Sequence, residues 1–426
     1  MKRRPFLGIL ASLGLAAAAS KAHARVENNP PLEDEELKKA LDQPDPSRPL
    51  LQRPTKDSVS VAWSVERPST GWVEWGTTPD LGNTARSSIG GLNVFDERFL
   101  SAKIEGLQPG TTYYYRTVTQ GMEFIRYGKL FSGDPVYGEV NTFTTADETA
   151  DTAKFAIFSD THETIPYLQA LAKRIDEFEP QCVIWNGDLL NDTNSADQAI
   201  RGILKAADTP WNSNRPAFLT GGNHDHRGPW ARKLTQIFLP QNETCPKYHQ
   251  LIYNFAYRIG PVAIIGLDTG EDKPDFHPIW SGLSNFDAMR VLQAEWLEET
   301  LNRPEIASAP FVVAVCHIPL YAKDPNANPG EILDGWAYWQ RRCAELWTPV
   351  LNKYKVQVVV TGHLHNPIKA EPADENRGWV QMHGGAGEEK NRTIILGQIE
   401  DGRLVMRREN LTKGEVDEEL FFDPRS

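Results

Sequence analysis

Between residues 50 and about 147, hydrophobic positions alternate with polar ones in short runs that are separated by turns. A period of two places successive side chains on opposite faces of an extended strand. No helical spacing lies between the runs, so the region predicts an all-β sandwich. The predicted strands are residues 58–65, 71–75, 100–104, 113–118 and 140–144.

From Lys154 onward the period lengthens, and short β-branched runs alternate with stretches of helical spacing. This alternation predicts an α/β domain built in layers. The predicted strands are residues 155–158, 183–185, 262–267, 311–315 and 356–360, and the predicted helices are residues 165–178, 286–301 and 336–353.

Polar residues follow five of the apolar runs at the point where each run ends. Because the carboxyl ends of strands in an α/β domain meet at one rim, these segments are expected to share a site. Carboxylates, imidazoles and amide oxygens are the donors that hold Fe, Mn or Zn. The segments are Asp160-Thr161-His162, Gly187-Asp188, Gly222-Asn223-His224-Asp225, Cys316-His317 and Gly362-His363-Leu364-His365.

The composition narrows the class of protein. A chain of 426 residues is expected to form two folded domains. With 40% hydrophobic and 24% charged residues it has the balance of a globular protein. Its formal net charge of -12 offers no basic face for a nucleic-acid polymer. An anionic substrate would therefore be attracted by something local, such as bound metal ions.

The N-terminus has the pattern of an export signal. Lys2, Arg3 and Arg4 precede an apolar stretch over residues 6–19, and Ala22-His23-Ala24 fits a small-x-small cleavage site. The stretch is shorter than a membrane-spanning helix, so no membrane anchor is expected after cleavage. The arginine pair resembles a twin-arginine signal, and the general secretory route stays open. The predicted location is periplasmic or secreted.

The four cysteines lack the paired spacing of a zinc site. Cys182 and Cys316 lie in or beside apolar runs and are expected to be buried thiols. Cys245 and Cys343 are candidates for a disulfide, although the sequence does not decide their connectivity.

The five polar segments, in this order, resemble the motifs of the calcineurin-like metallophosphoesterase superfamily over residues 154–400. Trp63 and the segment leading to Tyr113 resemble a fibronectin type III-like sandwich, in which the Tyr113 hydroxyl bonds back to the upstream backbone. The whole chain thus resembles the two-domain purple acid phosphatases. The resemblance implies one metal held by Asp160, His162, Asp188 and His365, and a second held by Asp188, Asn223, His317 and His363.

Two positions depart from the purple enzymes. Those enzymes carry a ligand Tyr three residues after the Asp of Gly-Asp, where this chain has Asn191. Their first motif ends in Gly, where this chain has His162. An imidazole in place of a phenolate predicts a colourless site and leaves the choice among Fe, Mn and Zn open.

The resemblance also implies an activity, the hydrolysis of phosphate mono- or diesters by a hydroxide that bridges the two metals. His224 is expected to assist the leaving group, with Asp225 orienting its ring. Asn191, His226 and Arg227 are candidates for contact with a small phosphorylated substrate.

Two other functions stay open, a nuclease or nucleotide phosphodiesterase of the same superfamily, and a non-catalytic binding module. The predicted organisation is a signal peptide over 1–24, a linker over 25–49, a sandwich over 50–147, a phosphoesterase domain over 150–410 and a tail over 411–426. The phosphoesterase domain is expected to be a β-sandwich flanked by helices. The substrate and the oligomeric state are not decided by the sequence.

Overall fold

The computed structural model describes residues 35–206, 211–240, 242, 245–321, 336–385 and 388–425. The predicted signal peptide, residues 1–24, lies outside the described residues. Within them, no helix is both long and apolar enough to cross a membrane.

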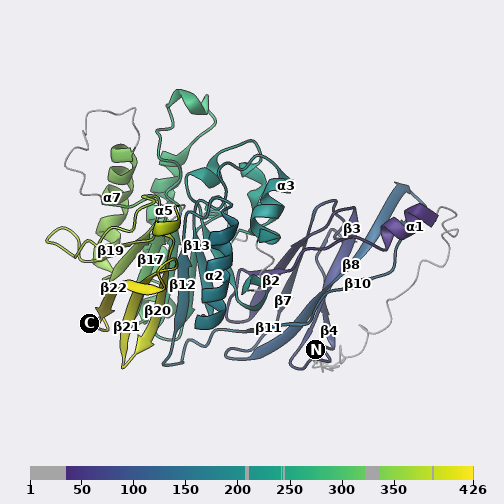
Figure 1. Ribbon diagram of the computed structural model, residues 1–426, viewed down its shortest axis with the longest axis horizontal. Coiled ribbons are helices and arrows are strands. Elements are labelled where there is room, and N and C mark those ends of the chain that lie inside the picture. The colour runs from purple at the N-terminus through teal and green to yellow at the C-terminus, as the bar shows by residue number, and fades with distance from the viewer. Residues whose placement is uncertain are drawn as a thin grey trace, which may run out of the picture.

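The N-terminal half is a sandwich of two sheets (Figure 1). One sheet face consists of β1 (Leu50–Gln52), β2 (Ser58–Ser64) and β7 (Phe99–Glu105). The opposite sheet consists of β3 (Ser69–Gly76), β4 (Asn83–Ala85), β8 (Thr112–Arg126), β9 (Lys129–Ser132), β10 (Val136–Tyr137) and β11 (Asn141–Thr144). A separate small hairpin pairs β5 (Ser88–Ile89) with β6 (Leu92–Asn93). Side chains from both sheets, Trp63 and Tyr115 among them, form one buried core.

The predicted bond of Tyr113 is present. Its hydroxyl accepts the backbone N–H of Gln108 at 2.8 Å, and its ring packs against Phe143 of β11. This contact ties the start of β8 to the turn that precedes it, as expected for a tyrosine at the corner of a sandwich.

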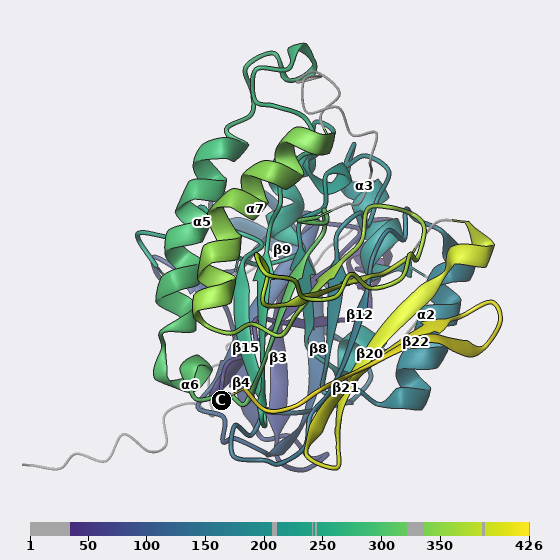
Figure 2. The ribbon, with the colours of Figure 1, turned by 90° about the vertical axis from the view of Figure 1, so that its left-hand side faces the viewer.

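The C-terminal half has four layers, with a helix layer on each outer side of two packed sheets (Figure 2). In the first sheet, β12 (Lys154–Phe158), β13 (Cys182–Asn186) and β14 (Ala217–Thr220) run parallel. On the other side of β12 lie the antiparallel strands β20 (Thr393–Glu400), β21 (Arg403–Asn410) and β22 (Glu415–Phe422). The second sheet has the order β15 (Phe255–Ile259), β16 (Val262–Leu267), β17 (Phe311–Cys316), β18 (Val358–Thr361) and β19 (Val380–His383).

The helices cover the outer faces of these sheets because each has one apolar stripe. Helix α2 (Ile165–Phe178) buries Leu168, Leu171 and Ile175 against the first sheet. On the second sheet, α5 (Phe286–Leu301) and α7 (Trp336–Lys353) lie side by side (Figure 2). The short helices are α3 (Ala196–Ala199), α4 (Trp211–Asn214) and α6 (Pro304–Ala307). The predicted β-sandwich flanked by helices is therefore confirmed.

The two halves share one sheet. Strand β1 pairs with β14 in parallel at Gln52 and Ala217, so a single nine-stranded sheet runs from β22 to β7. The buried Gln52 side chain donates to the carbonyl of Ile237 and accepts the N–H of Leu239, each at 2.7 Å. The Tyr115 hydroxyl donates to the carbonyl of Ser213 at 2.7 Å. These contacts fix the N-terminal sandwich against the C-terminal half.

Two boundary expectations and one candidate disulfide differ from the structure. The predicted linker contains a helix, α1 (Glu35–Leu41), and the predicted tail contains β22, which pairs along β21. Half of the residues of β22 are charged, and cross-strand ion pairs such as Arg408 with Asp417 at 2.7 Å join it to β21. The candidate disulfide is not formed, and all four cysteines are free thiols, of which Cys182 and Cys316 are buried as expected.

Candidate metal centre

The five polar segments meet where their strands end, as predicted. Asp160 follows β12, Asp188 follows β13 and Asn223 follows β14, all in the first sheet. His317 and His363 follow β17 and β18, which are parallel neighbours in the second sheet. The site therefore lies between the carboxyl edges of two packed sheets, where ligand sites of α/β proteins form.

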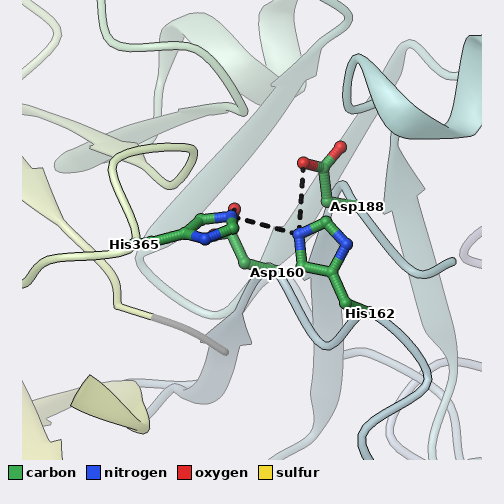
Figure 3. A group of neighbouring side chains, drawn as sticks. All are labelled: Asp160, His162, Asp188 and His365. Atoms are coloured by element: carbon green, nitrogen blue, oxygen red, sulfur yellow. Dashed lines mark hydrogen bonds and ion pairs between the residues drawn. The ribbon is translucent and has the colours of Figure 1, made fainter. Parts of the chain in front are cut away.

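The first cluster contains the four side chains expected to hold one metal (Figure 3). One ligand atom from each of Asp160, His162, Asp188 and His365 lies within 4.8 Å of every other. The Nε2 atoms of His162 and His365 are 3.1 Å apart, and each faces a carboxylate oxygen at 3.6 Å and 3.4 Å, respectively. Two imidazole nitrogens and two carboxylates directed at one point form the donor set of a first-row metal.

The second cluster shares Asp188 with the first. Asp188, His317 and His363 again offer ligand atoms within 4.8 Å of one another. Asn223 lies beside them, its Oδ1 2.9 Å from Nδ1 of His363. Six of the seven predicted ligands thus form two groups that share Asp188, and the seventh, Asn223, lies beside the second group.

Several of these residues adopt a backbone conformation that ordinary side chains avoid. Asp160, His162, Asp188, His363 and His365 have φ values of 55°, 43°, 53°, 69° and 51°. Left-handed φ costs about 1–3 kcal/mol for a residue other than glycine, and such residues persist only where surrounding contacts enforce them. The fold therefore holds these five candidate ligands in unfavourable backbone conformations that direct their side chains toward the two clusters.

Glycine is required at two positions of the predicted turns. Gly187 has φ 79°, and a Cβ placed on it would lie 2.6 Å from Nδ1 of His317. A Cβ on Gly222 would lie 2.4 Å from both the backbone nitrogen and Oδ1 of Asp188. Any side chain there would displace the neighbouring candidate ligand.

The charges of the site fit a cation pair. His317 is fully buried, and its Nε2, which has no hydrogen bond of proper geometry, lies 3.2 Å from Oδ2 of Asp188. Burial lowers the pKa of His317, but the charges of Asp188 and Asp160 outweigh it and raise that pKa to about 10. Burial likewise opposes ionisation of Asp188, and the surrounding imidazoles reverse this and hold its pKa below the usual range. Buried carboxylates that demand compensating positive charge, next to an unsatisfied imidazole nitrogen, suit a bound metal.

The expected role of Asp225 is wrong. Its carboxylate accepts the backbone N–H groups of Gly222 and Asp188 at 2.9 Å and 2.8 Å through Oδ2, and that of Leu189 at 3.1 Å through Oδ1. The side chain is fully buried, and its hydrogen bonds go to these backbone groups and not to the ring of His224. On the short 3₁₀ turn of residues 224–226, consecutive side chains point in different directions, so Asp225 faces inward while His224 faces the site.

The His224 ring is held by other groups. Its Nδ1 bonds to the carbonyl oxygen of Asn191, and its Nε2 lies 3.0 Å from Nη1 of Arg227. The ring also contacts that of His162 edge-on, with centroids 4.8 Å apart. His224 therefore borders the first cluster without belonging to either group of candidate ligands.

The three residues considered for substrate contact have different surroundings. Asn191 is exposed, and its backbone carbonyl orients His224. His226 is largely buried, with Nε2 3.0 Å from Oδ1 of Asp268, so it supports the loop instead of facing a substrate. Arg227 is bound to Glu271 and Asp272.

Asp268 and Glu271 were missed by the sequence reasoning. They follow β16 as part of Asp268-Thr269-Gly270-Glu271-Asp272. The other five segments were predicted because a polar run follows an apolar strand. This sixth segment has the same pattern and could have been predicted in the same way.

Comparisons with protein families match both halves of the chain. The model described as calcineurin-like phosphoesterase matches residues 153–367, and the model described as purple acid phosphatase, N-terminal domain, matches residues 44–149. The metallophosphoesterase half and the preceding strand-rich half thus each resemble a known domain, in the order that the sequence predicts.

Curated relatives and solved structures agree with these matches. Probable purple acid phosphatase 20 of Arabidopsis thaliana is 23% identical over 72% of this chain and 65% of its own length, and purple acid phosphatase 22 of that plant is 25% identical over 62% and 51%. The chain therefore spans about half to two thirds of these relatives. Purple acid phosphatase PPD1 from yellow lupin (Lupinus luteus) seeds has the same fold, with a TM-score of 0.64 at 14% identity, covering 90% of this chain and 75% of that chain. PhoD reaches a TM-score of 0.53 at 12% identity, covering 88% and 89%.

Proposed function

This chain belongs to the calcineurin-like phosphoesterase family, and on that premise we propose that it is an exported hydrolase that cleaves phosphate mono- or diesters with two bound metal ions. The observation that carries the proposal is the pair of ligand groups joined by Asp188. A carboxylate placed between two donor groups is what a two-metal phosphoesterase requires.

The chain's own residues supply distinct parts of the chemistry. Asp160, His162, Asp188 and His365 would hold one ion, and Asp188, Asn223, His317 and His363 the other. Metal ions bound there would lower the pKa of a water molecule and offset negative charge on the phosphoryl oxygens. His224, at the border of the first group, would assist departure of the leaving oxygen.

The acidic balance of the chain supports a small substrate. With a formal net charge of -12, the protein repels polyanions, so attraction of a phosphate group is left to the centre itself. The N-terminal sandwich, tied to the other half through Gln52 and Tyr115, supports the catalytic half.

The test uses the protein from residue 25 onward, chelated and then reconstituted with Mn, Zn or Fe. We expect about two ions per chain by elemental analysis, and metal-dependent hydrolysis of p-nitrophenyl phosphate or bis-p-nitrophenyl phosphate. The preferred compound distinguishes a monoesterase from a diesterase. A chain with neither bound metal nor turnover would be a binding module, contrary to the proposal.

Two variants sharpen this test. Asp188→Asn removes the negative charge and one of the two oxygens of the residue common to both groups, so we expect less than one ion per chain and no measurable turnover. Asp151→Asn alters an exposed carboxylate outside the site and should leave metal content and rate unchanged.

Export is tested separately. Residues 1–24 fused to a periplasmic reporter should direct it out of the cytoplasm, and Arg3→Lys with Arg4→Lys should block this if the twin-arginine route is used. Retention of the reporter with the intact segment would refute export.

A further inference from the structure

Arg227 makes a set of bonds that the proposed function does not use. Its Nε and Nη2 donate to the two carboxylate oxygens of Glu271 at 2.8 Å and 2.6 Å, and Nη2 also reaches Asp272 at 3.1 Å. The side chain of Glu271 is fully buried. A bidentate pair of this kind fixes the plane of the guanidinium. Its remaining nitrogen, Nη1, lies 3.0 Å from Nε2 of His224.

The loop that carries Glu271 is itself anchored from α5. Arg290, also fully buried, donates to the carbonyl of Thr269 at 3.0 Å and 2.7 Å and to that of Glu271 at 2.8 Å. Gln293 exchanges two hydrogen bonds with the backbone of Asp268. A continuous set of hydrogen bonds thus runs from helix α5 through Glu271 and Arg227 to the ring of His224.

These bonds select one form of the His224 ring. The Asn191 carbonyl can only accept, so the hydrogen of the neutral ring lies on Nδ1. Nε2 then carries a lone pair, which accepts the hydrogen bond from Arg227. Both ring nitrogens are therefore engaged, so the plane and the tautomer of the ring are fixed, and Nε2 can reach a leaving oxygen only once its bond from Arg227 is broken.

We propose that Arg227, held by Glu271, is a positioning residue that fixes the plane and tautomer of His224, and acts on the reaction only through that ring. Its effect on rate rests on the proposed function. Four of the five N–H donors of Arg227 are already given, three to Glu271 and Asp272 and one to His224, which leaves a single N–H on Nη1.

The kinetic test is a double-mutant cycle on an activated ester. Arg227→Ala should lower kcat by about 10–100-fold, as loss of a supporting partner does, with little change in KM. Adding it to His224→Ala should cause no further loss, since a positioning residue has nothing left to position. Multiplied effects, or a rise in KM alone, would show direct contact with substrate and overturn the proposal.

The matched control is another bidentate pair, Arg174 with Glu409, which joins α2 to β21 away from the site. Arg174→Ala should leave kcat and KM unchanged. If both arginine variants lose the same activity in proportion to lost folded protein, the role of Arg227 is purely structural.

A second readout requires no turnover. Ring ¹⁵N spectra, with the His224 signals assigned by their loss in His224→Ala, should show the Nδ1-protonated tautomer in the unaltered chain. Arg227→Ala should give a mixture of tautomers. Arg227→Lys should keep the original tautomer only in part, because a single ammonium group cannot form the two parallel hydrogen bonds of the guanidinium. An unchanged ring in Arg227→Ala overturns the inference even if hydrolysis is confirmed, and absence of hydrolysis with the expected spectra would refute the proposed function alone.

Discussion

The carboxylate of Asp225 accepts the backbone N–H of Asp188 at 2.8 Å. Asp225, which follows His224 in the sequence, therefore holds in place the candidate ligand that both groups share. The same carboxylate also receives the N–H of Gly222. It therefore joins the turn after β13 to the turn after β14, and the position of Asp188 depends on both turns.

Gly222→Ala is expected to damage the centre although it replaces none of the candidate ligands. The new Cβ would lie 2.4 Å from backbone and carboxylate atoms of Asp188, and the backbone there cannot yield cheaply. We expect a loss of about 1–3 kcal/mol in the free energy of unfolding, with reduced metal content. Denaturant unfolding and elemental analysis measure both. Gly378→Ala, whose Cβ would meet its nearest atom at 3.5 Å, serves as the control.

His224→Ala is expected to separate chemistry from metal binding. Because His224 is outside both ligand groups, the variant should retain its metal while kcat falls by about a hundred- to ten-thousand-fold. The exposed His249 supplies the control variant, His249→Ala. Activity at the unaltered level in His224→Ala would remove this residue from the mechanism.

Tyr115→Phe is expected to weaken the attachment of the two halves. The hydroxyl is buried and donates to the carbonyl of Ser213 at 2.7 Å, so its removal leaves that acceptor unsatisfied. The expected cost is about 1 kcal/mol in the free energy of unfolding. Calorimetry should show a single unfolding transition, shared by the two halves, at a lower temperature than in the unaltered chain. Tyr114→Phe, on the same strand but with its side chain only partly buried, should be neutral.

His383 is expected to make the fold sensitive to acid. Burial first, and then the charges of Arg408 and Arg377, lower its pKa from 6.5 to about 4. The unfolded chain therefore binds a proton at this ring more tightly than the folded chain does. The contribution of the neutral ring to the free energy of unfolding is fully present above pH 6.5 and is lost as the pH decreases toward 4. The full difference is about 3 kcal/mol. His383→Gln should flatten stability across this window, measured with chelator present throughout, whereas His249→Gln should not.

The hydrophobic pattern predicted the three long helices and five strands of the C-terminal half, but it did not predict strands β14, β15, β19, β20 and β21. Helices α2, α5 and α7 have the predicted bounds. Strand β22 was missed because charged residues occupy much of it and pair across to β21. Periodicity reports burial of apolar side chains, and a strand held by ion pairs gives little such signal.

The candidate ligands could be predicted because each follows a strand, and parallel strands bring their ends together. The residues that hold these ligands and His224 in place could not be predicted. Asp225 was assigned to the ring of His224 because the two are adjacent in sequence, yet adjacent residues on a tight turn face apart. The bond from Glu271 to Arg227 spans 44 residues, and no local spacing encodes it.

The single pairing of β1 with β14 has a consequence for the catalytic half as a separate molecule. Without β1, β14 would become an edge strand and present unpaired N–H and C=O groups to solvent. Exposed edges of this kind recruit strands from other chains. The N-terminal sandwich thus caps an aggregation-prone border, and the catalytic half produced alone should self-associate even if its metal centre forms.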